Sequence, residues 1–382
     1  MKTILIYGTG SYVLGNRHVK AVILPSILNF LISNQIKSKL VFIKKSNTNY
    51  SEIDKKIKSI LSSFKIKITY EIFSLDIMKN NEILNLYKKE NIFCSIISTP
   101  DNDHYNIAID CFKNKIDIIV VKPLVLNSKQ NEKLIKLSKK NNCVGFVDYH
   151  KRFDRQSKLI KEYNLNNIKS LYLIDINYSQ KKIVSTELFN WVSKSNILNY
   201  LGSHYIDFVY HTSNYKPKSV MAIGTKKYLI KKKINTYDSI ICLIKWVRGK
   251  DQFILNLKVN WIDPKNESSM SDQRVVMYYT NSKILSDQKN RGFYISTDNN
   301  NFESINPDFN QVYSNKKNSR LSYEGYGYES IFTFLTLINQ KANKKQINYK
   351  EYSNIEHSMI VSKVLEASQR SLNNKSKWIE ID

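Results

Sequence analysis

Short apolar runs alternate with helix-like periodicity through the first part of the chain, and this alternation restricts the possible folds more than any other feature. Six runs are predicted as strands, at 2–7, 39–43, 66–73, 93–98, 116–121 and 143–147. The segments between them carry apolar residues at i, i+3 and i+4, which predicts helices at 18–34, 51–63, 79–90, 102–114 and 128–141. Because continuously apolar strands are buried on both faces, the pattern predicts a parallel, doubly wound α/β sheet.

From about residue 167 the strands become longer and alternate apolar with polar residues, at 168–177, 218–225, 239–247, 253–261 and 273–280. A helical stretch near 200–212 interrupts them, so an α+β domain on a mostly antiparallel sheet is predicted. Residues 286–327 are polar and are predicted as loops and short strands, followed by helices at 328–340 and 352–372. The predicted domains are the doubly wound domain over 1–148, the α+β domain over 149–351, and a C-terminal helix and tail over 352–382 that pack back on the body.

The chain is strongly basic, with 59 Lys and Arg against 33 Asp and Glu, a formal net charge of +26. The lysines are spread in ones, twos and threes over the whole length, which is typical of a solvated surface and not of a nucleic-acid partner; attraction of an anionic substrate stays open. Four widely spaced cysteines without a CxxC pair suit reduced thiols in a cytoplasmic protein. Neither a signal peptide nor a membrane span is expected.

The first predicted strand ends in a glycine turn with the sequence Gly-Thr-Gly. Glycine at position 8 permits a tight turn, and glycine at position 10 lets the backbone approach a pyrophosphate at the start of the next helix. The third glycine of the usual GxGxxG pattern is a valine here, and an ordinary tight turn is the alternative. The residues expected to bind the dinucleotide are Gly8, Thr9, Gly10, Ser11, Tyr12 and Val13.

The end of the second predicted strand gives an expectation about the type of dinucleotide. An acidic residue that binds the ribose 2′-hydroxyl is expected there, but the chain has Lys44, Lys45 and Ser46. Two lysines and a serine suit a 2′-phosphate better, so NADP is favoured over NAD. In a chain this rich in lysine, chance alone could place them.

Four further motifs occur in a characteristic order, and with them the sequence resembles the Gfo/Idh/MocA oxidoreductases. They are Ser98-Thr99-Pro100 with His104, Val121-Lys122-Pro123, Tyr149-His150-Lys151-Arg152-Phe153-Asp154, and Gly202-Ser203-His204-Tyr205-Ile206-Asp207. The resemblance implies a Rossmann domain joined to an α+β domain with an open, mostly antiparallel sheet. It also implies hydride transfer between the nicotinamide and a sugar carbon, with the substrate between the two domains. A homodimer or homotetramer through the open sheet is implied as well, and Ser98, Thr99, Pro100, His104 and Lys122 are expected beside the cofactor.

The chain departs from this family at two positions. Val121 stands where the family usually has glutamate, and Tyr200 stands where it usually has an aspartate four residues before the histidine. The segment 287–292, Asp-Gln-Lys-Asn-Arg-Gly, resembles an offshoot of the family for which no substrate is assigned.

Lys122 is the first candidate for proton transfer. It lies at the carboxyl end of a predicted parallel strand, where open α/β sheets bind ligands. An amine beside the reacting hydroxyl donates a hydrogen bond or, with a lowered pKa, relays the proton. The alternative is one surface lysine among many.

His204 is the second candidate. On a helix, Tyr200, His204, Asp207 and His211 lie on roughly one face, so the tyrosine hydroxyl is expected to share a proton relay with the histidine. A structural histidine is the common alternative. A metal site formed by His204, Asp207 and His211 is disfavoured, because no third ligand set is indicated, and no metal is predicted.

The remaining site predictions concern substrate binding. His150, Arg152 and Asp207 are expected to bind hydroxyls or a phosphate, with a solvated hinge at 150–152 as the alternative. Trp191, Trp246 and Trp261 belong to the core or stack on a sugar.

The sequence therefore favours an NAD(P)-dependent dehydrogenase or reductase acting on a sugar, nucleotide-sugar or polyol. Two alternatives use the same parts: a glycosidase that oxidises its sugar transiently with a tightly held NAD, and a dinucleotide-binding protein without catalysis. Val121 and Tyr200 keep the last alternative open.

Overall fold

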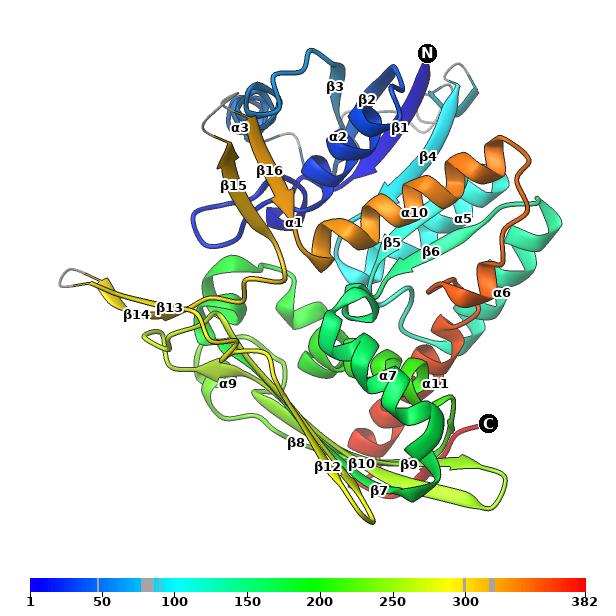
Figure 1. The fold of residues 1–382 in the computed structure, drawn as a ribbon, viewed down its shortest axis with the longest axis vertical. Coiled ribbons are helices and arrows are strands. Elements are labelled where there is room, and N and C mark those ends of the chain that lie inside the picture. Colours follow the sequence, from blue (N-terminus) through cyan, green and yellow to red (C-terminus); the bar gives the residue numbers. More distant parts are fainter. Residues whose placement is uncertain (47, 77–85, 89–90, 298–299, 316–319) are drawn as a thin grey trace. The chain divides into compact units, whose positions relative to one another are not determined.

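The computed structural model describes residues 1–46, 48–76, 86–88, 91–297, 300–315 and 320–382. The chain forms two compact units. The first contains Met1–Leu124, Glu132–His150 and Asp308–Glu356, and the second contains Val125–Asn131, Lys151–Pro307 and His357–Asp382. Each unit has its own sheet (Figure 1).

The first unit is built on a six-stranded parallel sheet with strand order β3-β2-β1-β4-β5-β6. The side chains of β1, β2, β4, β5 and β6 are mostly buried, which explains their continuously apolar sequences, whereas the edge strand β3 is more exposed. This confirms the predicted doubly wound sheet. The strands are β1 (Lys2–Tyr7), β2 (Ser38–Lys44), β3 (Thr69–Ser74), β4 (Ile92–Ile97), β5 (Ile118–Val121) and β6 (Gly145–Asp148).

The helices of this unit are α1 (Ser11–Leu14), α2 (Ile23–Ser33), α3 (Tyr50–Ser63), α5 (His104–Lys113), α6 (Ser128–Lys140) and α10 (Tyr326–Ala342), with the division between units passing through α6. The predicted helix 18–34 begins only at Ile23. The Asn16 side chain accepts hydrogen bonds from the backbone of His18 and Val19, which holds a turn there. The predicted helix 79–90 falls mostly outside the described residues.

The second unit is built on a seven-stranded sheet with strand order β12-β11-β7-β10-β9-β8-β17, antiparallel except between β7 and β10. This confirms the predicted α+β architecture. Its strands are β7 (Leu171–Lys181), β8 (Lys216–Thr225), β9 (Ser239–Arg248), β10 (Asp251–Asp263), β11 (Ser271–Tyr279), β12 (Lys283–Asp287) and β17 (Ile379–Glu380). Its helices are α7 (Arg155–Asn167), α8 (Ser203–Ser213), α9 (Tyr228–Lys231) and α11 (Ser358–Asn373).

One predicted boundary needs correction. Residues 308–351, predicted within the α+β domain, and residues 352–356, predicted within the C-terminal segment, belong to the first unit, because α10 packs on its elements. Phe332 lies edge-on to Phe30 of α2, and Phe334 stacks on Phe146 of β6 with ring centroids 5.1 Å apart. The Ser353 carbonyl also accepts a hydrogen bond from the Val147 backbone. Helix α11 therefore starts at Ser358 instead of 352.

The polar region 286–327 contains two small hairpins, as predicted. They are β13 (Tyr294–Thr297) with β14 (Asn300–Ser304), and β15 (Gln311–Asn315) with β16 (Arg320–Glu324). Among the described residues, no helix is long and apolar enough to cross a bilayer. Short 3₁₀ and π turns complete the chain at Asp101–Asp103, His150–Phe153, Ile168–Ser170, Val184–Leu188, Val192–Lys194, Leu198–Gly202 and Tyr349–Glu351.

Candidate active site

The two glycines of the turn after β1 have different roles. Gly8 has a φ of +103°, and a Cβ there would overlap the carbonyl of Ser98, so the fold itself requires glycine. Gly10 has an ordinary φ of −72°, and a Cβ there would meet no atom within 4 Å. The backbone at Gly10 therefore faces open space, which fits the close approach of a dinucleotide. The following helix α1 is a single turn.

The loop after β4 lies against this turn and is tied to the loop after β5. The Thr99 hydroxyl oxygen is shielded from solvent, and no hydrogen-bond partner for it occurs in the described part of the chain. His104 is fully buried; its ring nitrogens lie 2.9 Å from the Thr99 carbonyl oxygen and 2.8 Å from that of Pro123. His104 therefore lies between the loop after β4 and the loop after β5, and its predicted place beside the cofactor stays a prediction. Ser98, Thr99 and Pro100 remain candidates.

Lys44, the last residue of β2, and Lys45, which follows it, have different surroundings. The Lys44 ammonium donates to the Thr48 carbonyl and lies 4.5 Å from the ring centre of Tyr50, and burial lowers its pKa. Lys45 is exposed and forms an ion pair with Asp103 at 3.6 Å. The Lys44 ammonium thus contacts the loop that follows the strand, and its predicted contact with a 2′-phosphate stays a prediction. Lys45 and Ser46 stay candidates as well.

Lys122 follows β5 and lies near two buried carboxylates. Burial lowers the pKa of Lys122 to about 8, although the charges of Asp101 and Asp148 act in the opposite direction. Asp148 is the last residue of β6 and pairs with Val121 in the strand register. An amine with this pKa exchanges protons near neutral pH, as the predicted role requires.

Asp148 is also the centre of a group of polar side chains that the sequence did not reveal. It accepts hydrogen bonds from the hydroxyls of Tyr12 and Ser330, each at 2.7 Å. The predicted substrate residue His150 lies in this group, with Nδ1 3.4 Å from the Tyr12 hydroxyl and 3.9 Å from Asp148 Oδ2. Its ring packs near Phe309, with centroids 5.1 Å apart.

The predicted substrate residues Arg152 and Asp207, both in the second unit, bind each other. The guanidinium donates from Nε and Nη2 to the two carboxylate oxygens at 2.8 and 2.5 Å, and both side chains are buried. The remaining terminal nitrogen, Arg152 Nη1, lies 3.4 Å from His357 Nδ1. The predicted contact of Arg152 and Asp207 with substrate stays a prediction. His211 lies nearby; burial, with Arg152 and other cations, lowers its pKa to about 2.

His204 lies in the first turn of α8, and its ring centroid is 6.5 Å from that of Tyr178 of β7. Tyr200 lies in a π turn before the helix, where its ring contacts Phe189, Trp191 and Trp261. Trp246 and Trp261 are fully buried core residues, and Trp191 stacks on Phe189.

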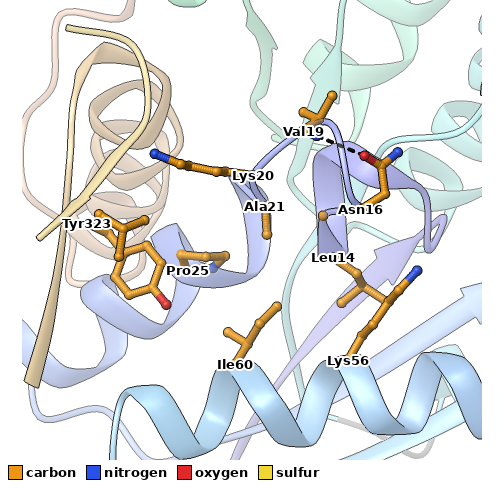
Figure 2. A pocket seen from close by; sticks show the side chains of 11 residues that line it. Leu14, Asn16, Val19, Lys20, Ala21, Pro25, Lys56, Ile60 and Tyr323 are labelled. Carbon is orange, nitrogen blue, oxygen red and sulfur yellow. Dashed lines mark hydrogen bonds between the residues drawn. The ribbon is translucent and has the colours of Figure 1, made fainter. Parts of the chain in front are cut away.

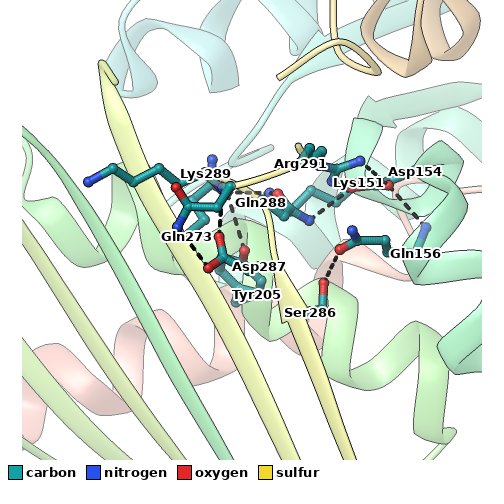
Figure 3. Close-up of polar contacts among 11 residues, drawn as sticks. Lys151, Asp154, Gln156, Tyr205, Gln273, Ser286, Asp287, Gln288, Lys289 and Arg291 are labelled. Carbon is teal, nitrogen blue, oxygen red and sulfur yellow. Dashed lines mark hydrogen bonds and ion pairs between the residues drawn. The ribbon is translucent and has the colours of Figure 1, made fainter. Parts of the chain in front are cut away.

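The segment 287–292 forms a network with the start of α7 (Figure 3). Gln288 donates to Asp154 at 2.9 Å and accepts from the Lys151 ammonium at 2.7 Å. Lys151 also donates to Gln273 of β11. Arg291 binds the Asp154 carboxylate through Nη1 and Nη2 at 3.1 and 2.5 Å. The segment 287–292 is therefore bound to Asp154, at the start of α7, through Gln288 and Arg291.

A hollow of about 360 Å³ lies elsewhere in the first unit, between the loop after α1, helix α3 and the β15–β16 hairpin. Figure 2 shows Leu14, Pro25, Ile60 and Tyr323 around it. It contains none of the predicted site residues. The described residues include no cluster of three or more His, Cys, Asp or Glu side chains suited to a metal ion.

Comparison with known proteins agrees with the turn and the parallel sheet. Residues 3–149 match the Gfo/Idh/MocA model, described as an oxidoreductase family with an NAD-binding Rossmann fold. Over these residues the chain is similar to this family. The Thermotoga maritima myo-inositol 2-dehydrogenase is 31% identical over 77 residues, which are 20% of this chain and 23% of that enzyme. The matched segment thus spans about a quarter of that relative.

Solved structures with a similar fold cover both units. GenD2 from gentamicin A biosynthesis, in complex with NAD, has a TM-score of 0.70 at 13% identity, covering 100% of this chain and 96% of that one. The Lactobacillus casei scyllo-inositol dehydrogenase with bound NAD(H) and scyllo-inositol has a TM-score of 0.66 at 14% identity, covering 100% and 99%. At such identities the likeness shows the fold alone.

Proposed function

We propose that this chain is a member of the Gfo/Idh/MocA family and an NAD(P)-dependent dehydrogenase or reductase acting on a carbinol carbon of a sugar, nucleotide-sugar or related polyol. The observation that supports this best is the position of Lys122, an amine with a pKa near 8 at the carboxyl end of β5, in the same unit as the glycine turn. The names of the inositol dehydrogenases among its relatives support a polyhydroxylated substrate.

In this proposal the chain's own residues bind the cofactor and move a proton. When bound, the nicotinamide supplies the hydride acceptor or donor. The backbone from Gly8 to Val13 holds the pyrophosphate, with room at Gly10, and Thr99 offers a hydroxyl to the ligand. Neutral Lys122 accepts the proton of the hydroxyl being oxidised and, as an ammonium, returns it in the reverse direction.

His204 is proposed as the second proton-transferring residue, because the family motif falls on it and because it opens α8 beside Tyr178. The shared relay with Tyr200 stays a prediction. Replacing Tyr200 with Phe tests it: a change in the pH dependence of kcat supports the relay, and an unchanged profile assigns the tyrosine to its aromatic cluster.

NADP is proposed as the preferred cofactor, on the strength of Lys45 and Ser46. Titration of the protein with each cofactor tests this. The matched variant Lys45→Asp should shift the ratio of affinities toward NAD, since a carboxylate repels the 2′-phosphate and accepts from the 2′-hydroxyl. A wild-type protein that binds NAD more tightly contradicts the proposal.

A second copy of the chain is proposed to pack on the sheet of the second unit, giving a homodimer or homotetramer. Ile223 of β8 and Ile241 of β9 are paired neighbours there, with exposures of 52% and 42%. Burying such a pair stabilises an interface. Light scattering checks this: replacing both isoleucines with Glu should yield a smaller particle.

The reaction is tested by following reduction of NAD and NADP in the presence of cyclic polyols, sugars and nucleotide-sugars. Reduction of the cofactor by at least one of these classes is expected. A protein that binds a dinucleotide but reduces it with none of them lacks the proposed function.

A further inference from the structure

Asp148 in the first unit interacts with three other parts of that unit: the segment after the glycine turn, helix α10 and Lys122. It is the last residue of β6, and its register partner is Val121 of the neighbouring parallel strand. Carboxyl ends of parallel strands share one edge of the sheet. Asp148 therefore lies at the edge where Lys122 follows β5.

The carboxylate of Asp148 is buried, with 2% of the residue exposed, and its orientation is fixed from two elements. The Tyr12 hydroxyl, from the turn after Gly10, donates to Oδ2, and the Ser330 hydroxyl of α10 donates to Oδ1. Both donors are neutral. Burial of a charge bound only by neutral groups is costly, so a nearby cation stabilises it.

The negative charge of Asp148 acts on the amine of Lys122. This amine is affected by two negative charges, Asp101 from the turn after β4 and Asp148 from β6. Tyr12 and His150 also lie close to the Asp148 carboxylate, and the charges of Tyr326 and Tyr328 of α10 act on the Tyr12 hydroxyl. Asp148 thus interacts both with Tyr12, which follows the glycine turn, and with Lys122, which is proposed for proton transfer.

We propose that Asp148 is a positioning residue for Lys122: its carboxylate, held by Tyr12 and Ser330, fixes the amine of Lys122 at the edge of the sheet beside the cofactor turn. This inference rests on the proposed function, since Lys122 is the residue on which Asp148 acts. Asp148 itself is not proposed to touch the substrate.

The test measures the protonation of Lys122 without any substrate. Competitive acetylation over a range of pH, followed by peptide mass spectrometry, gives the titration midpoint of this amine in the wild-type chain and in Asp148→Asn. Loss of the negative charge should lower the midpoint by about one pH unit or more. Asp148→Glu should restore most of the shift. An unchanged midpoint in folded Asp148→Asn overturns the proposal.

Two further variants complete the experiment. Glu71→Gln is the matched control, because Glu71 pairs with Lys39 on the same sheet at 3.0 Å and its loss should leave the Lys122 midpoint unchanged. If Asp148→Asn does not fold, Ser330→Ala takes its place. Removing one neutral donor strengthens the effect of the carboxylate on the amine, so the midpoint should rise, and no change overturns the proposal.

The outcome is separate from that of the proposed function. A chain that reduces neither cofactor with any polyol or sugar lacks the proposed activity, whatever the titration shows. A chain with that activity and an unshifted Lys122 midpoint in Asp148→Asn keeps the function and loses the role of Asp148.

Discussion

Two buried aspartates, six positions apart in the sequence, are held in opposite ways. Asp154 of the second unit is fully buried and bound by the two terminal nitrogens of Arg291, with further hydrogen bonds from Gln288 and the Gln156 backbone. Asp148 of the first unit is bound directly by two neutral hydroxyls.

The difference separates a carboxylate whose charge is neutralised by an arginine from one whose charge still acts on a neighbouring amine. A bidentate guanidinium neutralises Asp154 and fixes its geometry. The hydroxyls around Asp148 fix its geometry without neutralising it, so its charge acts on Lys122. Arg152 and Asp207 repeat the first arrangement. In both pairs the guanidinium neutralises the buried carboxylate.

The largest effect is expected at Lys122. The Lys122→Gln variant should lose kcat by roughly 10²–10⁴, the range for a general acid–base residue, while cofactor affinity changes by less than about threefold. Steady-state kinetics and cofactor titration measure the two quantities. A kcat close to that of the wild type would remove Lys122 from the reaction.

The Asp154 side of the comparison is tested through stability. Arg291→Met leaves Asp154 buried without its cation and should lower the free energy of unfolding by about 3–5 kcal/mol, measured by urea denaturation. Asp148→Asn, the matched change at the other aspartate, should cost only about 1–2 kcal/mol. Equal losses at both sites would abolish the distinction.

The glycine turn gives a cofactor effect of intermediate size. Gly10→Val places a side chain in open space, so dinucleotide affinity should fall by at least about tenfold with the melting temperature unchanged. Gly8→Ala is the contrast: it should destabilise the fold, because its Cβ meets the Ser98 carbonyl. Undiminished affinity in Gly10→Val would place the cofactor elsewhere.

The smallest effect is a shift along the pH axis. Oxidation requires Lys122 to be unprotonated, and its pKa is about 8, so kcat/KM should rise about tenfold per pH unit below 8 and level off above it. In Asp148→Asn the rise should move to lower pH, because the amine loses a negative neighbour. A profile without a rise near pH 8 contradicts the assignment of Lys122.

Much of the fold could be predicted because local sequence determines it. The six runs predicted as strands in the first unit lie within a few residues of β1–β6, and for all but the edge strand β3 the reason is burial on both faces. The Asn16 turn before α2 and the return of 308–356 to the first unit could not be predicted, because they depend on side-chain capping and on packing between distant segments.

The site was predictable in part for the same reason. Lys122 stands out because it follows a strand and precedes a proline. Asp148 gave no signal beyond its place at the end of a strand, because its partners Tyr12 and Ser330 are 136 and 182 positions away. The pairing of Arg152 with Asp207, 55 positions apart, was equally hidden.

The buried imidazole of His104 has a consequence for how binding is transmitted. One rigid ring spans the Thr99 carbonyl, beside the glycine turn, and the Pro123 carbonyl, next to Lys122. The two loops consequently behave as one mechanical unit, and a displacement of one strains the contact to the other. Under the proposed function, dinucleotide binding at the turn and the placement of the Lys122 amine would then be linked, and linkage is reciprocal.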